Sequence, residues 1–501
     1  MAAVVLAALW IAVLVLSRAP ILRQALVDTL NDKLDADVEL QGFEVRTFPL
    51  FRIHGDGLTL RLKNQQNPSP FIEVKHFEVA GGLFGMLKRP RRFTSVELEG
   101  LRITIPPRSS NDREAGSQAA SAVGGQVIVE RVTARDATLT IVPRDPAKEP
   151  KVWSIHDLEM TSVGFNRSMP FRATLSNPIP QGEIAAKGSF GPWVKQDPGL
   201  TPLSGTYSFD HADLGTIKGI GGILSSTGRF AGMLSRILVD GTTKTPDFSI
   251  DIGGAPAPLE TTFAAIVDGT NGNTYLQKVD ARLHHTAIEA SGAIASQPHV
   301  KGRTVTIDMQ VHDGRIEDLL ALAIRAPKPV MTGRVALRAS MTLPPGDRPV
   351  ADRLQLQGRF ALEHADFSDA KTKAQLVELS RRARGKKAFE ATGPVASEMR
   401  GQFTMREGHI RFEPVRFGVP GAEIELTGVY GLRSEQLDFA GTLGMDAPVS
   451  QAMGGGLKGW LLRPFDPLFR KNGHGALVPI TVTGPRAQPK FGLQWGKVLK
   501  Q

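Results

Sequence analysis

Most of this chain alternates between apolar and polar residues, which is the pattern of β-strands with one apolar face. The alternation is clearest in LTLRL at residues 58–62 and VTIDMQV at residues 305–311. The links between such runs are short, and Asn271-Gly272 in one of them is a strong hairpin-turn signal. Short links favour antiparallel neighbours, because a parallel pair needs a crossover of about a dozen residues or more. The sequence therefore predicts a mainly β fold, with roughly twenty to twenty-five strands in an elongated, twisted antiparallel sheet.

The alternation slips by one position at two glycines, Gly42 in VELQGFEV and Gly100 in VELEGLRITI. A slip at glycine is how a β-bulge shows in a sequence, and bulges add twist and curvature to a sheet. We therefore expect a twisted and curved sheet, whose apolar face could line a groove. The candidate lining residues of this groove are Leu58, Leu60, Leu62, Val305, Ile307, Met309, Val311, Val335, Leu337, Ile424 and Leu426.

Helical segments are few and short. Small helices are predicted at residues 81–87, at Arg315 to Ile324 and at Ala370 to Arg384, the last with Leu376 and Leu379 on one face. An antiparallel sheet with one apolar face normally buries that face against another layer, and these helices are too few to cover it. We therefore expect the sheet to fold on itself or to hold another apolar molecule.

The first nineteen residues predict a transmembrane anchor. Residues 1–16 carry no charge and would rise about 24 Å as a helix, slightly less than a bilayer core of about 30 Å. Residues 17–22 can complete the span, because Arg18 can snorkel to the interface. A cleaved signal peptide is the alternative, but the charged n-region is missing and Pro20 would follow the cut. The anchor positions are Leu6, Leu9, Trp10, Ile11, Leu14 and Leu16. By the positive-inside rule alone, the nearby Arg18 and Arg23 favour a cytoplasmic body.

An amphipathic helix is predicted directly after the anchor, over residues 20–34. Its apolar stripe is Leu22, Leu26, Leu30 and Leu34. One interpretation is a helix packed on the end of the sheet. The other is a cap or gate where the groove meets the bilayer.

Recognised catalytic and metal-binding motifs are missing from the sequence. The chain has no cysteine, which excludes a disulfide scaffold and a thiolate zinc site. His284 and His285, if they are adjacent in a strand, point to opposite faces and cannot share a metal. Residues 268–273 superficially resemble a calcium loop, but Thr and Gly at the third and fifth positions favour a hairpin turn. We therefore predict no enzyme activity, no cofactor and no metal site.

The net charge of +10 is spread along the chain, with two denser clusters. Aromatic residues are only 6% of the chain and do not interleave with a basic stripe, so nucleic acid is not an expected partner. One interpretation of the clusters is ordinary solvated charge at helix ends. The other is contact with anionic lipid headgroups, which contributes about 1 kcal/mol per basic residue at a membrane surface. The candidate headgroup contacts are Lys88, Arg89, Arg91, Arg92, Arg381, Arg382 and Arg384.

The order of these segments resembles the AsmA-like family of bacterial envelope proteins, which is related to TamB-type and chorein-type lipid-transfer proteins. The resemblance rests on the anchor, on LNDKLDADVELQGFEVRTFPLFRIHGDGLTLRL with its Phe48-Pro49 turn, on VELEGLRITI and VDGTTKTPDFSIDI, and on LVPITVTGPRAQPKFGL near the end. With it, the predicted division of the chain is an anchor at 1–19, an AsmA-like helix with first strands at 20–105, a flexible loop without apolar periodicity at 106–126, and an extended β-groove body at 127–501 that ends in an AsmA-like region. The resemblance implies that the body is an elongated, twisted sheet folded into a groove.

The resemblance also implies a single-pass protein of the bacterial inner membrane whose body lies in the periplasm. Its expected function is to bind phospholipids and pass them along the groove, in support of outer-membrane lipid homeostasis. Phospholipids and the inner membrane are the expected partners, with an outer-membrane or periplasmic protein as a further one. The alternative is a non-enzymatic scaffold or adaptor for outer-membrane protein assembly, with a sheet that is closed and dry.

Overall fold

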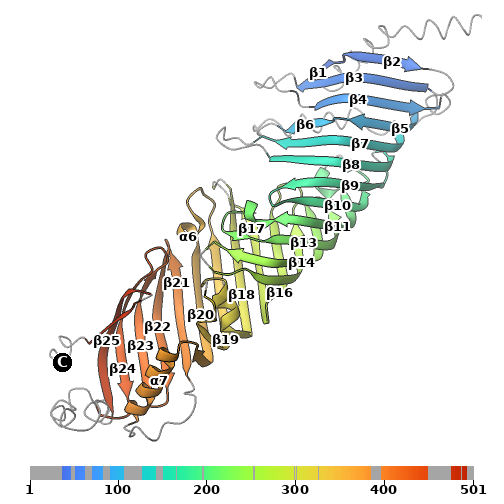
Figure 1. Cartoon of the computed structure of the whole chain (residues 1–501). Coiled ribbons are helices and arrows are strands. Elements are labelled where there is room, and N and C mark those ends of the chain that lie inside the picture. The colour runs from blue at the N-terminus through green and yellow to red at the C-terminus, as the bar shows by residue number, and fades with distance from the viewer. Residues whose placement is uncertain are drawn as a thin grey trace, which may run out of the picture. The chain divides into compact units, whose positions relative to one another are not determined.

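The computed structural model describes most of the chain and shows a mainly β protein with few helices (Figure 1). The described residues are 36–46, 51–62, 70, 72–82, 91–105, 127–142, 151–164, 166–194, 197–251, 254–297, 300, 302–324, 326–384, 397–448, 475–486 and 488–493. The predicted anchor, the helix at 20–34, the helix at 81–87 beyond residue 82, and the loop at 106–126 lie outside them.

The chain divides into two compact units, which we describe separately. The first contains Met1–Thr216, Leu224–Gly241 and Ile266–Gly272, and the second contains Ile217–Ile223, Thr242–Ala265 and Asn273–Gln501. We call them unit 1 and unit 2.

The strands of unit 1 are numbered in chain order. They are β1 (Ala36–Glu39), β2 (Gly42–Arg46), β3 (Phe51–Leu62), β4 (Ile72–Gly81), β5 (Arg91–Glu99), β6 (Arg102–Ile105), β7 (Val127–Ile141), β8 (Lys151–Val163), β9 (Met169–Pro178), β10 (Gln181–Phe190), β11 (Pro202–Asp213) and most of β13 (Ile223–Met233). Two 3₁₀ turns, η1 (Pro198–Leu200) and η2 (Leu214–Thr216), flank β11.

In its described residues, unit 2 holds the remaining strands and three short helices. Its strands are β12 (Ile220–Gly221), β16 (Thr274–Leu283), β17 (Thr286–Ser296), β18 (Arg303–Arg315), β19 (Met331–Leu343), β20 (Gln355–Phe367), β21 (Glu398–Arg406), β22 (His409–Val419), β23 (Ala422–Gly431), β24 (Gln436–Met445), β25 (Ala476–Pro485) and β26 (Lys490–Leu493). β14 (Arg236–Ile250) and β15 (Ala257–Val267) contribute residues to both units. The helices are α5 (Ile316–Ala321), α6 (Val350–Arg353) and α7 (Ala370–Ala383).

Neighbouring strands pair antiparallel, as the short links predict, with one exception in unit 1. β5 and β6 both pair with β7 in parallel, for example Val96 opposite Val132 and Ile103 opposite Leu139. The link between β6 and β7 spans residues 106–126 and is long enough for the crossover that a parallel pair requires. A wholly antiparallel sheet is therefore wrong at this point.

Both glycines interrupt their strands, but the prediction of bulges is wrong, because the register does not shift across either interruption. Glu39 pairs with Thr59 and Gly42 with Asp56, so three steps on one strand face three steps on the other. The same holds where Glu99 pairs with His76 and Arg102 with Glu73. β1 and β2 are separated at Leu40-Gln41, immediately before Gly42, and the Gln41 N–H still donates to the Asp56 carbonyl at 3.0 Å. Gly100 separates β5 from β6, with a φ of +63° that a side chain rarely tolerates. The sheet continues past both interruptions because the neighbouring strand bridges them.

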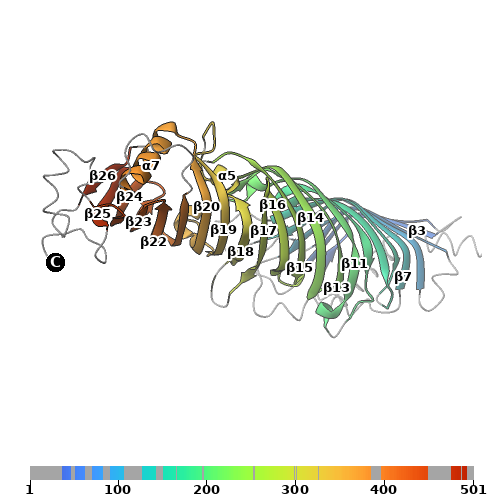
Figure 2. The ribbon, with the colours of Figure 1, turned by 90° about the horizontal axis from the view of Figure 1, so that it is seen from below.

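The helices at 315–324 and 370–384 are confirmed as α5 and α7. Asp369 caps α7, since its carboxylate accepts from the Thr372 N–H at 2.8 Å. The segment at 213–224 is the 3₁₀ turn η2 followed by the short strand β12. α5 packs on β18 and β19, and α7 packs on β20 and β23, and both are labelled along the same side of the sheet in Figure 2.

An apolar sheet face with few covering elements

The apolar positions of unit 2 lie on one face of its sheet, strand after strand. One cross-strand row shows this over seven strands, because each member sits opposite the next. The row is Ile307, Met341, Leu356, Met405, Ile410, Tyr430 and Leu437. The adjacent row on the opposite face is polar: Asp308, Ser340, Gln357, Thr404 and Arg411. We call the two sides the apolar face and the polar face.

Four phenylalanines form an aromatic stripe along the apolar face. Phe360 on β20 is 6.5 Å from Phe403 on β21, measured between ring centroids, and Phe403 is 6.5 Å from Phe412 on β22. Phe412 in turn is 5.7 Å from Phe439 on β24. Tilted rings at these separations attract one another by about 0.5–1.5 kcal/mol per pair beyond the area that they bury. The stripe is a smooth hydrocarbon surface that crosses five strands.

Glycines make room for this stripe. Gly428 on β23 lies between Phe412 and Phe439, and a Cβ there would come within 2.7 Å of the Phe439 ring. Gly358 and Gly401 occupy the same relation to Phe403 and Phe360. The rings therefore lie flat over the backbone of the neighbouring strand.

Within the part of the chain that the structure describes, no second layer buries the large side chains of the apolar face. Among the residues that the structure describes, buried hydrophobic residues are mainly Ala, Val and a few Leu and Met, and no Phe, Ile or Trp is buried. The four stripe rings are all half-buried. A β-sandwich would cover such rings with a facing sheet. The face is therefore available to another apolar molecule.

α5 and α7 cover one edge of this face. Ile316 and Leu319 of α5 pack on Val335 and Leu362. Leu376, Leu379 and Ala383 of α7 pack on the β22–β24 edge, where their contacts are Val419, Ala422, Phe417, Leu443 and Met445. Each helix is short, so most of the stripe stays outside its cover.

Hydrogen bonds fasten α7 to the sheet. The buried Ser380 hydroxyl donates to the Pro420 carbonyl at 2.7 Å, and the Ala447 N–H donates to the Ala383 carbonyl at 2.7 Å. α7 is therefore an integral edge of unit 2.

Unit 1 has the same two-faced design. Ile53, Leu58 and Leu60 of β3 sit opposite Val79, Val74 and Ile72 of β4 on the apolar face. Its polar face carries ion pairs between neighbouring strands, such as Arg61–Glu39 at 2.7 Å and Arg131–Glu159 at 3.3 Å. Exposed pairs of this kind contribute little stability, about 0–1 kcal/mol each. These charged side chains make one face of the sheet polar, and the apolar side chains lie on the opposite face.

The structure places the predicted lining residues other than Leu62 on the apolar face. Leu58 and Leu60 lie in unit 1, and Leu62 is the β3 residue opposite Ala36. The others lie in unit 2, namely Val305, Ile307, Met309, Val311, Val335, Leu337, Ile424 and Leu426. Val311 and Val335 are buried near α5, whereas Met309 and Leu337 are half-buried. The aromatic stripe was not predicted from the sequence, although Phe403 and Phe412 each stand between two polar residues.

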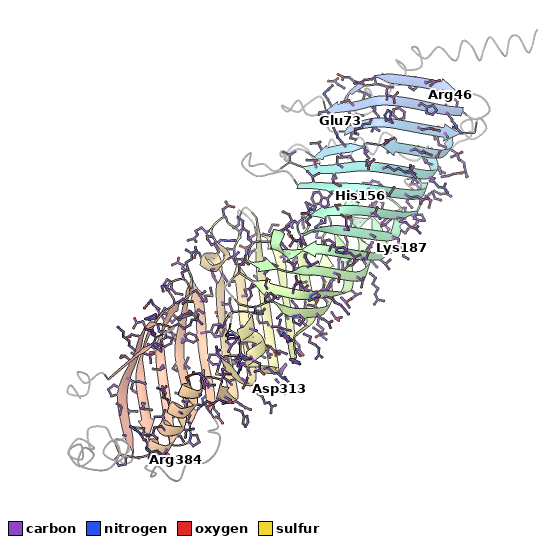
Figure 3. All side chains as sticks on the ribbon, in the orientation of Figure 1. Arg46, Glu73, His156, Lys187, Asp313 and Arg384 are labelled. Atoms are coloured by element: carbon purple, nitrogen blue, oxygen red, sulfur yellow. The ribbon has the colours of Figure 1, made fainter. Side chains whose placement is uncertain are left out.

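The arginines at residues 381–384, which were predicted to contact lipid headgroups, have partners within the protein. Arg381 Nη2 and Arg382 Nε both bind the Glu378 carboxylate, at 2.6 and 2.5 Å. Arg384 Nε, at the end of α7 (Figure 3), donates to the Ser380 carbonyl at 3.2 Å. Lys88, Arg89 and the Arg91 side chain lie outside the described residues, and Arg92 is exposed on β5. In α7 the arginines pair within their own helix.

This pairing predicts a pH dependence of α7. Hydrogen bonds from Arg381 and Arg382 lower the pKa of Glu378 from 4.5 to about 2. Since the folded pKa is depressed, the stabilisation is complete above pH 4.5 and is lost as the pH falls towards 2. The pair is exposed, so we expect a loss of only about 0.5 kcal/mol. Hydrogen exchange of the α7 amides, corrected for their intrinsic exchange rates, measures this loss of stability. The Glu378→Gln variant should show no such change over this pH range, and an equal change there would contradict the assignment.

The part of the chain that the structure describes contains no group of three or more His, Asp or Glu side chains placed to hold a metal ion. The prediction that His284 and His285 lie in a strand is wrong. They form the turn between β16 and β17, with ring centroids 5.6 Å apart and nearly parallel planes. Asn271-Gly272 lies in a turn, as predicted, and the Asp268 carboxylate accepts from the Thr270 N–H at 2.9 Å.

The described helices include none that is long and apolar enough to cross a membrane. No protein-family model, curated protein or solved structure matches the chain.

Proposed function

We propose that the protein is a membrane-anchored envelope protein that binds phospholipids by their acyl chains on its apolar face and passes them along the sheet. The observation that carries the proposal is the uncovered apolar face with its half-buried aromatic stripe. The order of sequence motifs, which resembles the AsmA-like family, supports the same function.

The energetics of the apolar face suit a sliding ligand. Each methylene that leaves water for such a surface contributes about 0.8 kcal/mol. Successive cross-strand rows offer similar Leu, Ile, Met and Phe side chains, so this contribution changes little from one row to the next. A uniform surface binds an acyl chain without a deep trap, which allows movement along it.

Photocrosslinking at two adjacent residues of β18 tests the proposal. Met309 lies on the apolar face and Gln310 on the polar face of the same strand, so a photoreactive residue at either site samples one face only. In the full chain within native membranes, we expect mass spectrometry to find phospholipid adducts at position 309 and few at position 310.

Equal lipid labelling at both positions, or none at 309, would contradict lipid binding on this face. The scaffold alternative predicts protein adducts instead. Leu60 and Thr59 of β3 are the corresponding pair in unit 1, because Leu60 sits opposite Ile72 and Thr59 opposite Glu73.

A further inference from the structure

The polar face of unit 2 contains a hollow that lipid binding does not explain. It has a volume of about 360 Å³ and spans β19 to β22. Ala339, Gly358 and Phe403 contribute to its lining, and around them stand the polar side chains of Arg338, Ser340, Gln357, Arg359, Gln402, Thr404, Arg411 and Glu413. Binding sites for small molecules in proteins commonly measure roughly 300–1,000 Å³. The hollow is therefore large enough for a small polar ligand.

Two arginines stand side by side in the lining of this hollow. Arg338 on β19 is directly opposite Arg359 on β20 in the strand register. Like charges at directly opposed positions of an antiparallel pair destabilise the sheet. An oxyanion between the two guanidinium groups would turn this repulsion into attraction, because each can donate two parallel hydrogen bonds to it.

The surrounding residues leave this charge uncompensated. Arg338 Nη2 donates to the neutral Gln310 Oε1 at 2.9 Å, and within the described residues neither Arg338 nor Arg359 has a carboxylate ion-pair partner. The single carboxylate among the lining residues is Glu413, which is 3.9 Å from Arg411 Nε. Hydroxyl and amide donors from Thr404, Gln357 and Gln402 complete a lining that suits an anion.

A second hollow on the polar face differs from the first in its balance of charge. It measures about 530 Å³ and contains another opposed pair, Arg400 and Arg416. There Arg416 Nε lies 3.1 Å from Glu425, and four acidic residues join the lining: Glu363, Glu398, Glu423 and Asp446. That charge is already balanced by the protein, whereas the charge of Arg338 and Arg359 is not.

We propose that the hollow lined by Arg338 and Arg359 is a binding site for a phosphate-type oxyanion, which the two guanidinium groups bind together. It lies on the sheet face opposite to the apolar face, so it does not depend on the lipid function proposed above. A soluble phosphate compound and the phosphate of a lipid headgroup share the required chemistry.

Pyrophosphate binding to the full chain in detergent, measured by titration calorimetry at constant ionic strength, tests this site. We expect saturable binding that Arg359→Gln weakens at least tenfold. The matched control is Arg229→Gln on β13, since Arg229 is also exposed but lies 3.5 Å from an acidic partner, Asp240. This control should bind pyrophosphate as the unmodified chain does.

Hydrogen exchange gives a second readout that a merely structural role would not produce. Without pyrophosphate, Arg359→Gln should slow exchange of the β19 and β20 amides, because the repulsion is removed. With pyrophosphate, only the unmodified chain should gain further protection. An absence of pyrophosphate binding to the unmodified chain, or full binding to Arg359→Gln, would overturn the site.

A competition experiment distinguishes the two sources of the oxyanion. Competition by phosphatidylglycerol vesicles but not by phosphatidylcholine vesicles would assign the oxyanion to a lipid headgroup. Lack of competition by either kind of vesicle would assign it to a soluble compound.

Discussion

Phospholipid transfer is expected to fall at least tenfold in the Phe439→Asp variant. Phe439 ends the aromatic stripe on β24 and lies 5.7 Å from Phe412. A carboxylate there would keep its water shell, and an acyl chain sliding over it would have to remove that water. Removing water from an unpaired charge costs several kcal/mol, and every 1.4 kcal/mol is a tenfold change in an equilibrium or a rate. The measurement is the rate at which the full chain, reconstituted into donor vesicles, transfers labelled phospholipid to acceptor vesicles.

The matched control for this variant is Ala440→Asp. Ala440 is the next residue of β24 and sits opposite Thr427 and Thr481 on the polar face. It receives the same carboxylate at the same depth in the strand, but away from the apolar face. We expect transfer within twofold of the unmodified chain, with unchanged circular dichroism for both variants. Equal losses in the two variants, or none in Phe439→Asp, would exclude the stripe as the lipid path.

Release of α7 from the sheet is the second large effect that we expect, in the Ala383→Arg variant. Ala383 is fully buried against Val419 and Ala422, so an arginine there overfills the contact and brings in a charge. Overpacking alone costs about 1–3 kcal/mol, and the buried charge adds to it. A helix of this length is marginal in water once it loses its packing surface. Hydrogen exchange should therefore show loss of protection throughout α7, while β19 and β20 stay protected.

The control on the same helix is Ala374→Arg. Ala374 is exposed on α7, and arginine is a good helix former, so exchange should be unchanged or slightly slower. Release of α7 also uncovers Phe417, Leu443 and Met445, which enlarges the apolar face. Ala383→Arg should therefore increase the amount of photocrosslinked lipid on β22–β24. Retained protection of α7 in Ala383→Arg would show that the helix is not held by this contact.

Much of the candidate lipid surface follows from local pattern. In a strand, successive side chains point to opposite faces, so the alternation in VTIDMQV already places Val305, Ile307, Met309 and Val311 together. The slips at Gly42 and Gly100 likewise mark interruptions of the strands, but they are not bulges, because no extra residue enters the pairing at either glycine. The local sequence also indicates the C-terminal end of α7, because basic residues occupy the last turn and a glycine follows Arg384 in the sequence.

Other features depend on which strands become neighbours and in what register. The parallel pairing of β5 and β6 with β7 needs the long 106–126 link, but nothing in that link specifies the partner. The interpretation of His284 and His285 as strand residues failed for a related reason, because only the pairing of β16 with β17 makes them the turn.

The sequence by itself thus determined a mainly β chain with one apolar face, the strand interruptions at Gly42 and Gly100, and its two main helices. Only the tertiary structure decided that Phe360, Phe403, Phe412 and Phe439 form one stripe and that Arg338 faces Arg359. The physical reason is that alternation is set by the backbone of each strand alone, whereas cross-strand neighbours are set by register. Register depends on hydrogen bonds and bulges over the whole sheet, and a shift of one residue would move every side chain of a strand to the other face.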